Sequence, residues 1–415
     1  MPPVAHKQKN RGWTKLNLLV VSSYYRPASV YGGPTESIHK RSLALARLGH
    51  SVTTFTTDAN GTGALQTPPG KPVSVDGLPV TYFRRWWFGR SKMPANLFFS
   101  PELGRKLRKL PPGEFDLFVV HASFCDPGRI AAAAAKRTGT PYICYTHGSF
   151  EPWAINHKHW KKMVYWALIE KRILNEAAGI VVCNRAEIEQ LRRLGIKSPI
   201  RRIPWGVDLP NRETLPTRRR LEELWPPLKD RPFGLFLSRL HPKKGLDLLV
   251  PAFASLAREF PDWLLVLAGP DEGGYRAQVE RLIRDLALED RVICTGLVGG
   301  EAKAALLAHA DLFVLPSYSE GFPMVVAEAL GHGRPMVITP TCYVPEVAQG
   351  GAGLETPPEK EGVTGALRDM MRDEAFRRQC SARAYEVARQ YFTWQSVAEQ
   401  SLKFYQEVIE WHSLA

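Results

Sequence analysis

Short apolar runs alternate with amphipathic helical patterns along most of this chain, and this alternation limits the folds open to it. In the first half, the apolar runs "LNLLVVSS" and "FDLFVVHAS" are separated by stretches with helical periodicity such as "TESIHKRSLALARLG". Strands that are apolar throughout and separated by helices are typical of a parallel sheet covered on both faces. The first half is therefore predicted to be a doubly wound α/β domain.

A polar, proline-bearing segment at residues 211–232 interrupts this rhythm, as a connection between domains would. The alternation then restarts with "FGLFLSRL" and "DWLLVLAGP". A chain of 415 residues exceeds what one hydrophobic core usually serves. We therefore expect two doubly wound domains, each with a ligand crevice at the carboxyl ends of its strands, enclosing a cleft between them.

The chain carries a formal net charge of +14, and the surplus is uneven. Residues 84–109 hold eight Lys and Arg against one Glu, and residues 158–172 hold five against one. This distribution predicts an anionic partner that meets the N-terminal half. The six scattered cysteines read as reduced thiols. No signal peptide or run of eighteen apolar residues is visible, which predicts a cytoplasmic protein without a membrane span.

The stretch "SEGFPMVVAEALG" places Glu320 before a predicted helix that starts near Pro323, and places Glu328 inside that helix. Gly321 allows a ligand to approach the backbone, and the helix N-terminus offers N–H groups to an anion. Each carboxylate can accept two hydroxyl groups of a diol. The pattern suits a nucleotide sugar. The plainer alternative is that Glu328 is an exposed helix residue and that Glu320 is a capping partner.

Arg239 and Lys244 follow the first strand of the second domain in "FLSRLHPKKGLDLL". A guanidinium and an ammonium together can hold a diphosphate without a metal ion. The sequence contains no Asp-x-Asp motif, a common handle for a divalent metal ion. A basic loop that is merely solvated remains the alternative.

Two further candidates lie in the first domain. Gly32 and Gly33 end the loop after its first strand, where Thr35 could cap the next helix, and this arrangement suits an anion. A plain tight turn explains the glycines equally well. His147 in "YTHGSFEPW" follows a strand at its carboxyl end, where α/β domains place functional residues, although a structural histidine is the alternative.

"RLHPKKG" followed by "SEGFPMVVAEALGHGRPMV" resembles the retaining glycosyltransferases of family 4, and the resemblance extends over nearly the whole chain. It implies the GT-B fold, with an N-terminal acceptor domain at 13–205, a C-terminal donor domain at 206–390, and a final helix within 391–415 that packs back on the first domain. Trp205 in "IPWGVD" stands where the family usually has asparagine.

The resemblance also implies residue roles. Glu328 would bind the ribose of the donor, Glu320 and His147 the transferred sugar, and Arg239 and Lys244 the diphosphate. The remaining predicted contacts with the donor are Gly32 and Gly33 over the diphosphate, backbone near Leu297 for the base, and the loop Gly321, Phe322 and Pro323. Retention would proceed by front-face attack, in which the leaving diphosphate accepts the proton of the acceptor.

These observations predict a metal-independent transferase that needs no cofactor, uses a nucleotide-diphosphate sugar as co-substrate, and acts on a saccharide or lipid-linked acceptor in polysaccharide or glycolipid biosynthesis. A nucleotide-sugar epimerase of the same fold is one alternative. A nucleic-acid-binding module is another, disfavoured because no recognised nucleic-acid motif appears.

The basic stretches 84–109 and 157–172 mix cations with aromatic residues, which predicts peripheral contact with an anionic membrane on its cytoplasmic face. Trp160, Val164, Ala167 and Leu168 share one helical face. The alternative is that this face packs on the sheet.

Overall fold

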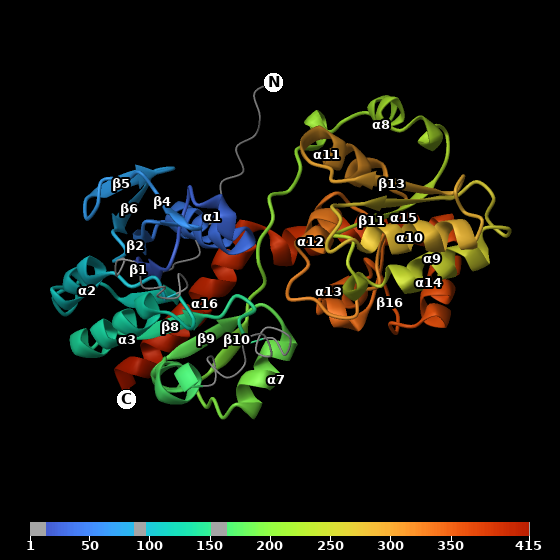
Figure 1. Cartoon of the computed structure of the whole chain (residues 1–415). Coiled ribbons are helices and arrows are strands. Elements are labelled where there is room, and N and C mark those ends of the chain that lie inside the picture. The colour runs from blue at the N-terminus through green and yellow to red at the C-terminus, as the bar shows by residue number, and fades with distance from the viewer. Residues whose placement is uncertain (1–13, 87–96, 151–163, 415) are drawn as a thin grey trace, which may run out of the picture.

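The computed structural model describes residues 14–86, 97–150 and 164–414. It has two α/β domains, each built on its own sheet, and a long C-terminal helix that extends from the second domain to the first (Figure 1). This architecture confirms the predicted GT-B arrangement.

The N-terminal sheet has eight strands in the order β10-β9-β8-β7-β1-β2-β6-β5. Their bounds are β1 Asn17–Ser22, β2 Ser51–Thr57, β5 Pro72–Val75, β6 Leu78–Phe83, β7 Leu117–His121, β8 Tyr142–Tyr145, β9 Gly179–Val182 and β10 Ile200–Arg202, with β3 Ala59–Asn60 and β4 Gly63–Ala64 forming a separate hairpin. All neighbours are parallel except the edge strand β5, which pairs antiparallel with β6. The expectation of a purely parallel sheet was therefore wrong at this edge.

Side chains of each central strand alternate between two cores, as the strand period of two requires. Leu19 and Val21 face the core beneath α2, α3 and α6, whereas Leu18 and Val20 face the core beneath α1 and the C-terminal helix. Among the described residues, the helices of this domain are η1 Ser29–Tyr31, α1 Gly33–Arg47, α2 Pro101–Arg108, α3 Asp126–Thr138, the π-helical η3 Trp166–Glu170 continuing into α6 Lys171–Glu176, and α7 Arg185–Arg193.

The C-terminal sheet has six parallel strands in the order β13-β12-β11-β14-β15-β16. Its strands are β11 Phe233–Leu237, β12 Leu264–Ala268, β13 Val292–Gly296, β14 Leu312–Leu315, β15 Met336–Ile338 and β16 Gly353–Glu355. The strand order reverses between β11 and β14, and in open α/β sheets ligands bind outside the carboxyl ends at such a switch point. The N-terminal sheet has the same reversal between β1 and β7.

Helices cover both faces of the C-terminal sheet. The helical segments of this domain are η4 Arg212–Thr214, α8 Arg218–Leu224, η5 Pro226–Leu228, η6 Pro242–Lys244, α9 Leu246–Leu256, α10 Tyr275–Asp285, α11 Gly300–His309, α12 Met324–Gly331, η7 Pro340–Cys342, α13 Glu346–Gln349, α14 Lys360–Arg372, α15 Glu374–Val387 and η8 Ala388–Phe392.

The C-terminal helix α16, Trp394–Leu414, returns to the N-terminal domain and packs against α1 (Figure 1). The hydroxyl groups of Tyr145 and Tyr405 share a hydrogen bond of 2.7 Å in the core beneath it. Near its start, Val207 forms a bridge with Thr393, so the two crossings between the domains lie side by side. The predicted return of the final helix is thus confirmed.

The expectations about membrane-spanning helices and about the cysteines can also be compared with the structure. In the part of the chain that the structure describes, no helix combines the length and apolar character needed to cross a membrane. All six cysteines are free thiols, and five of them are buried.

Candidate active site

The loops after β11 and β14 meet at the switch point of the C-terminal sheet. Gly245 has a left-handed backbone, with φ of 71°, and a Cβ atom there would lie 2.0 Å from the carbonyl oxygen of Pro316. The amide of Tyr318 donates to the carbonyl of Lys243 at 2.9 Å. Glycine is therefore needed at 245 both for the backbone conformation and for the close approach of the two loops.

This contact brings Lys244 and Glu320 together. The Lys244 ammonium lies 2.6 Å and 2.8 Å from the two carboxylate oxygens of Glu320, and both side chains are more than nine-tenths buried. The hydroxyl of Ser317 donates to Oε1 of Glu320 at 2.6 Å. A buried ion pair needs such additional hydrogen bonds to offset its desolvation, so the geometry of this pair is held firmly.

Two more predicted residues form ion pairs that are more accessible to solvent. Arg239 lies 2.8 Å from Glu272, and Glu328 lies 2.7 Å from Lys303. Glu328 is in the second turn of α12, which begins after Pro323 as predicted. Each charged residue that the sequence predicted to bind the sugar donor thus has a partner of opposite charge in the structure.

The loop from Glu320 to Pro323 also contacts the N-terminal domain. Asn184, which follows β9, donates from its side-chain amide to the carbonyl of Gly321 at 2.7 Å. The ring of Phe322 lies 6.3 Å from that of Trp205, between their centroids. The carboxyl edges of the two sheets are therefore joined at this loop. Leu297, predicted near the base, follows β13 and is 77% exposed.

His147 lies just beyond β8, in a left-handed conformation with φ of 50°. Nε2 of His147 and Nδ1 of His121 share a hydrogen bond of 2.8 Å. Within the described residues, Nδ1 of His147 is buried and has no hydrogen-bond partner. Burial lowers the pKa of His147 to about 3, and the positive charge of Arg41 acts in the same direction. Burial likewise lowers the pKa of His121. Both imidazoles are therefore neutral at neutral pH.

The glycine loop differs in detail from the prediction. Gly32, with φ of 65°, precedes α1, and Gly33 is the first residue of the helix. Thr35 does not cap α1, because it already lies inside the first turn and is buried, with its hydroxyl directed to the carbonyl of Ala28 at 3.4 Å. Gly33 lies against Trp205, since a Cβ atom at 33 would be 2.7 Å from Cζ3 of the indole.

Several residues of this site were not predicted from the sequence. They are Ser317, His121, Asn184, Lys303 and Arg41, which contact or surround the predicted residues from other segments. His121 carried a usable signal, because it ends β7, the strand beside the switch point of the first sheet.

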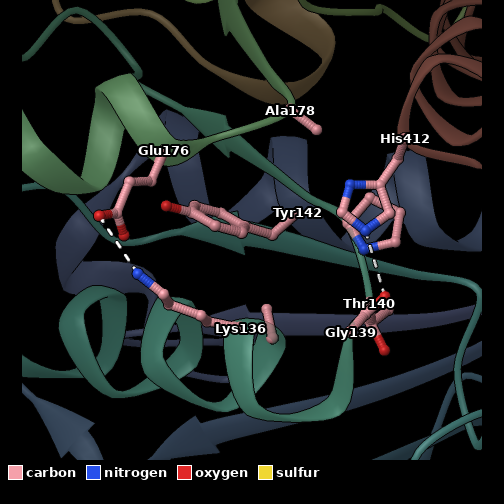
Figure 2. A pocket seen from close by; sticks show the side chains of 9 residues that line it. Lys136, Gly139, Thr140, Tyr142, Glu176, Ala178 and His412 are labelled. Carbon is pink, nitrogen blue, oxygen red and sulfur yellow. Dashed lines mark hydrogen bonds and ion pairs between the residues drawn. The ribbon is translucent and has the colours of Figure 1, made fainter. Parts of the chain in front are cut away.

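A pocket of about 310 Å³ lies elsewhere, at the beginning of β8 (Figure 2). Tyr142 and the Lys136–Glu176 ion pair line it, and His412 of α16 donates from Nε2 to the carbonyl of Gly139 at 3.2 Å. None of the predicted site residues lines this pocket, which is at the opposite edge of the sheet from His147.

Comparison with known proteins agrees with this geometry. Residues 31–210 match the family model described as Glycosyltransferase Family 4, and residues 219–387 match that of Glycosyl transferases group 1. Among curated relatives, D-inositol 3-phosphate glycosyltransferase of Nocardioides sp. is 28% identical over 90% of this chain and 85% of its own length. The GDP-mannose-dependent alpha-(1-6)-phosphatidylinositol monomannoside mannosyltransferase of Mycolicibacterium smegmatis is 28% identical over 66% of this chain and 72% of its own length.

Among solved structures, Anabaena Alr3699/HepE in complex with UDP superposes with a TM-score of 0.68. It is 19% identical and covers 94% of this chain and 100% of its own. At that identity the likeness shows the fold. Taken with the two family models, which between them span both domains, it leads to one conclusion: the chain is a glycosyltransferase and belongs to the family 4 glycosyltransferases.

Proposed function

We propose that this enzyme transfers a sugar from a nucleotide-diphosphate sugar to an acceptor hydroxyl, with retention of configuration and without a divalent metal. The observation that carries the proposal is the contact of Lys244 with Glu320 at the switch point of the C-terminal sheet, beside the start of α12. This edge of an α/β sheet is where a nucleotide would bind, and a helix N-terminus favours phosphate.

In this proposal the donor spans the site from α12 to the N-terminal domain. Glu328 accepts hydrogen bonds from the ribose hydroxyl groups, and Arg239 and Lys244 contact the diphosphate. His147, whose buried Nδ1 has no hydrogen-bond partner among the described residues, faces the transferred sugar together with Glu320. The names of the relatives mention both UDP and GDP, so the identity of the base is left to experiment.

The transfer breaks the bond between the anomeric carbon and the diphosphate oxygen and forms one to the acceptor oxygen. The acceptor proton passes to the leaving diphosphate. Negative charge grows on the leaving oxygen as the bond breaks, so Lys244 and Arg239 stabilise the transition state more than the ground state.

Retention without a covalent intermediate agrees with the state of Glu320. Both of its oxygens accept charge-assisted hydrogen bonds from Lys244, and Oε1 also accepts one from Ser317. A carboxylate engaged in this way is a poor nucleophile. Its place beside the sugar therefore suits electrostatic support of an oxocarbenium-like transition state.

An epimerase of the same fold would convert the donor without an acceptor. Following the donor with and without added acceptor separates the two activities. Transfer predicts that donor consumption depends on an acceptor hydroxyl, with free nucleoside diphosphate as co-product. A donor isomer formed without acceptor would overturn the proposal.

We expect turnover to persist in excess EDTA. The positive charges that face the diphosphate come from Arg239 and Lys244, and the sequence has no Asp-x-Asp motif for a bridging metal. The measurement is the initial rate after chelation and again after addition of magnesium or manganese. Activity that is lost with EDTA and restored by either ion would contradict metal independence.

We further propose that the acceptor is lipid-linked and that the N-terminal domain docks on an anionic membrane. The layer of α2, α3 and α6 on one face of the sheet carries the relevant surface. Its outward cations are Arg105, Lys106, Arg108, Lys109, Arg129, Lys136, Arg137, Lys171 and Arg172. Such a concentration of positive charge complements anionic headgroups.

Apolar side chains stand exposed at the edge of this basic layer. Val164 is 52% exposed and Leu168 is 72% exposed, and Ala167 between them is exposed as well. The opposite side of the same helix buries Trp166 and Leu174 in the core. The alternative in which Val164, Ala167 and Leu168 pack on the sheet is therefore wrong, and this exposed face supports membrane contact.

Two details of the predicted membrane surface change. Arg85 is buried, bonded to Asp58 at 3.0 Å, and is removed from the docking surface. Arg84 and Trp86 are exposed beside it. Residues 87–96 and 151–163, which include Trp160, lie outside the described residues.

We expect sedimentation with anionic vesicles, weaker sedimentation at high salt, and little with neutral vesicles. A triple variant, Arg105→Gln, Lys106→Gln and Lys171→Gln, should lose most of this binding, and Leu168→Asp should weaken it even at low salt. The matched control neutralises Arg219, Arg378 and Arg389, exposed arginines of the C-terminal half. Equal loss in the control, or equal binding to neutral vesicles, would contradict docking through this surface.

A further inference from the structure

Trp205 lies where the chain first crosses between the domains, and its indole contacts three segments of the candidate site. Its ring centroid is 5.9 Å from that of His147 and 6.3 Å from that of Phe322. Gly33, at the start of α1, lies against the edge of the same ring. One side chain therefore contacts the glycine loop, the histidine of the N-terminal domain and the loop of the C-terminal domain.

The contact with Gly33 is close enough to fix the residue type at that position. A methyl group at 33 would lie 2.7 Å from Cζ3 and 3.3 Å from Cη2 of the indole. Gly33 lies outside the left-handed backbone region, whereas the neighbouring Gly32 has φ of 65°. The backbone thus requires glycine at 32, while the indole requires it at 33.

Trp205 is also anchored at the return crossing of the chain. Phe322 lies 6.0 Å from Phe392, between ring centroids. The amide of Val207, two residues after Trp205, donates to the carbonyl of Phe392 at 2.6 Å. The segment that carries Trp205 and the Phe322 ring beside the indole are thus both tied to the return crossing. A large, rigid ring in such a place fixes distances at little cost in conformational entropy.

We propose that Trp205 is a positioning residue for transfer, a spacer whose indole sets the separation of the glycine loop, His147 and the loop from Glu320 to Pro323. The absence of a side chain at Gly33 leaves room for this indole. The inference rests on the proposed transfer function. It assigns a role at a position where the family usually has asparagine.

The test is a double-mutant cycle of Gly33→Ala and Trp205→Leu. Gly33→Ala should lower kcat about tenfold or more, because the methyl group displaces the indole. Trp205→Leu should lower kcat to a similar degree. The double variant should be no slower than Trp205→Leu alone, since the methyl group no longer meets a ring. Losses that multiply would mean that Gly33 acts directly on the donor, which would overturn the inference.

A second readout separates positioning from a merely structural role. The Kd of a nucleoside diphosphate should stay within a few-fold of wild type in the Trp205 variants, because the indole acts on the separation of the site segments rather than on the nucleotide. Trp205→Phe should recover part of the lost kcat. A uniform rise in Kd with kcat retained would contradict positioning.

Thermal unfolding of the same four proteins measures the contact without substrate. Gly33→Ala should lower the unfolding temperature in the wild-type background and have little effect beside Trp205→Leu. Gly365→Ala in α14 is the matched control, because a methyl group there meets nothing within 4 Å. Coupling in stability without coupling in kcat would overturn the positioning role. Failure of every assay with a sugar donor would instead count against the proposed function. The unfolding cycle would still show whether Gly33 and Trp205 are in contact.

Discussion

Replacing Lys244 by alanine is expected to lower kcat by about 10²- to 10³-fold at saturating sugar donor. A loss of this size follows removal of one preorganised hydrogen-bond donor that faces a developing negative charge. Lys244 is a buried cation of the site, 2.6 Å from Glu320. The negative charge on the leaving diphosphate oxygen grows only as the bond to the sugar breaks. The loss should therefore appear in kcat more than in the Kd of the sugar donor.

The same substitution leaves Glu320 buried without its cation, which typically lowers the free energy of unfolding by about 3–5 kcal/mol. Circular dichroism and thermal unfolding must therefore accompany the kinetics. Lys244→Arg keeps the charge, should remain folded, and should lose less activity than Lys244→Ala. Lys243→Ala, one residue earlier in the same turn, is the control and should leave kcat nearly unchanged. A Lys244→Ala enzyme that folds, turns over normally and binds donor weakly would contradict the assignment.

Glu328→Ala is expected to raise the Kd of the nucleotide donor about 10- to 150-fold, which corresponds to the roughly 1.5–3 kcal/mol of a lost hydrogen bond to a charged group. The ribose contact does not change during transfer, so kcat at saturating donor should stay close to wild type. Equilibrium titration with a nucleoside diphosphate measures the Kd directly.

The ion pair between Glu328 and Lys303 provides the control for this prediction. Lys303→Met removes the ion pair but keeps the carboxylate, and it should change the Kd by only a few-fold because the pair is partly exposed. Equal losses in Glu328→Ala and Lys303→Met would mean that the ion pair matters and that the ribose contact does not.

The layered fold could be predicted because each half of the chain repeats one local pattern of buried strands and amphipathic helices. The exception is the edge of the first sheet, where β5 and β6 are joined by Asp76 and Gly77, both with positive φ. An Asp-Gly pair between two short strands is a strong hairpin signal. The sequence "SVDGLPV" thus contained the antiparallel pairing, although the surrounding parallel pattern concealed it.

The site was predictable only in part, for a different reason. Glu320 and Lys244 each stand in a recognisable local motif, but their contact joins positions 76 residues apart and depends on how two loops pack at Gly245. The packing of Trp205 against Gly33 is likewise a tertiary contact that local periodicity does not contain. The sequence therefore indicated which residues could bind a donor, and the fold determined which of them pair with one another.

Ligand-induced thermal stabilisation tests the central proposal, a nucleotide-diphosphate sugar site at the carboxyl edge of the C-terminal sheet, most directly. The unfolding temperature of the wild type and of Glu328→Ala is measured with UDP, GDP, ADP and their sugars. A ligand at one hundred times its Kd stabilises the native state by about 2.7 kcal/mol. The account predicts that at least one nucleotide raises the unfolding temperature of the wild type by several degrees, and that Glu328→Ala loses most of this shift at the same concentration. No shift with any nucleotide, or an equal shift in both proteins, would contradict it.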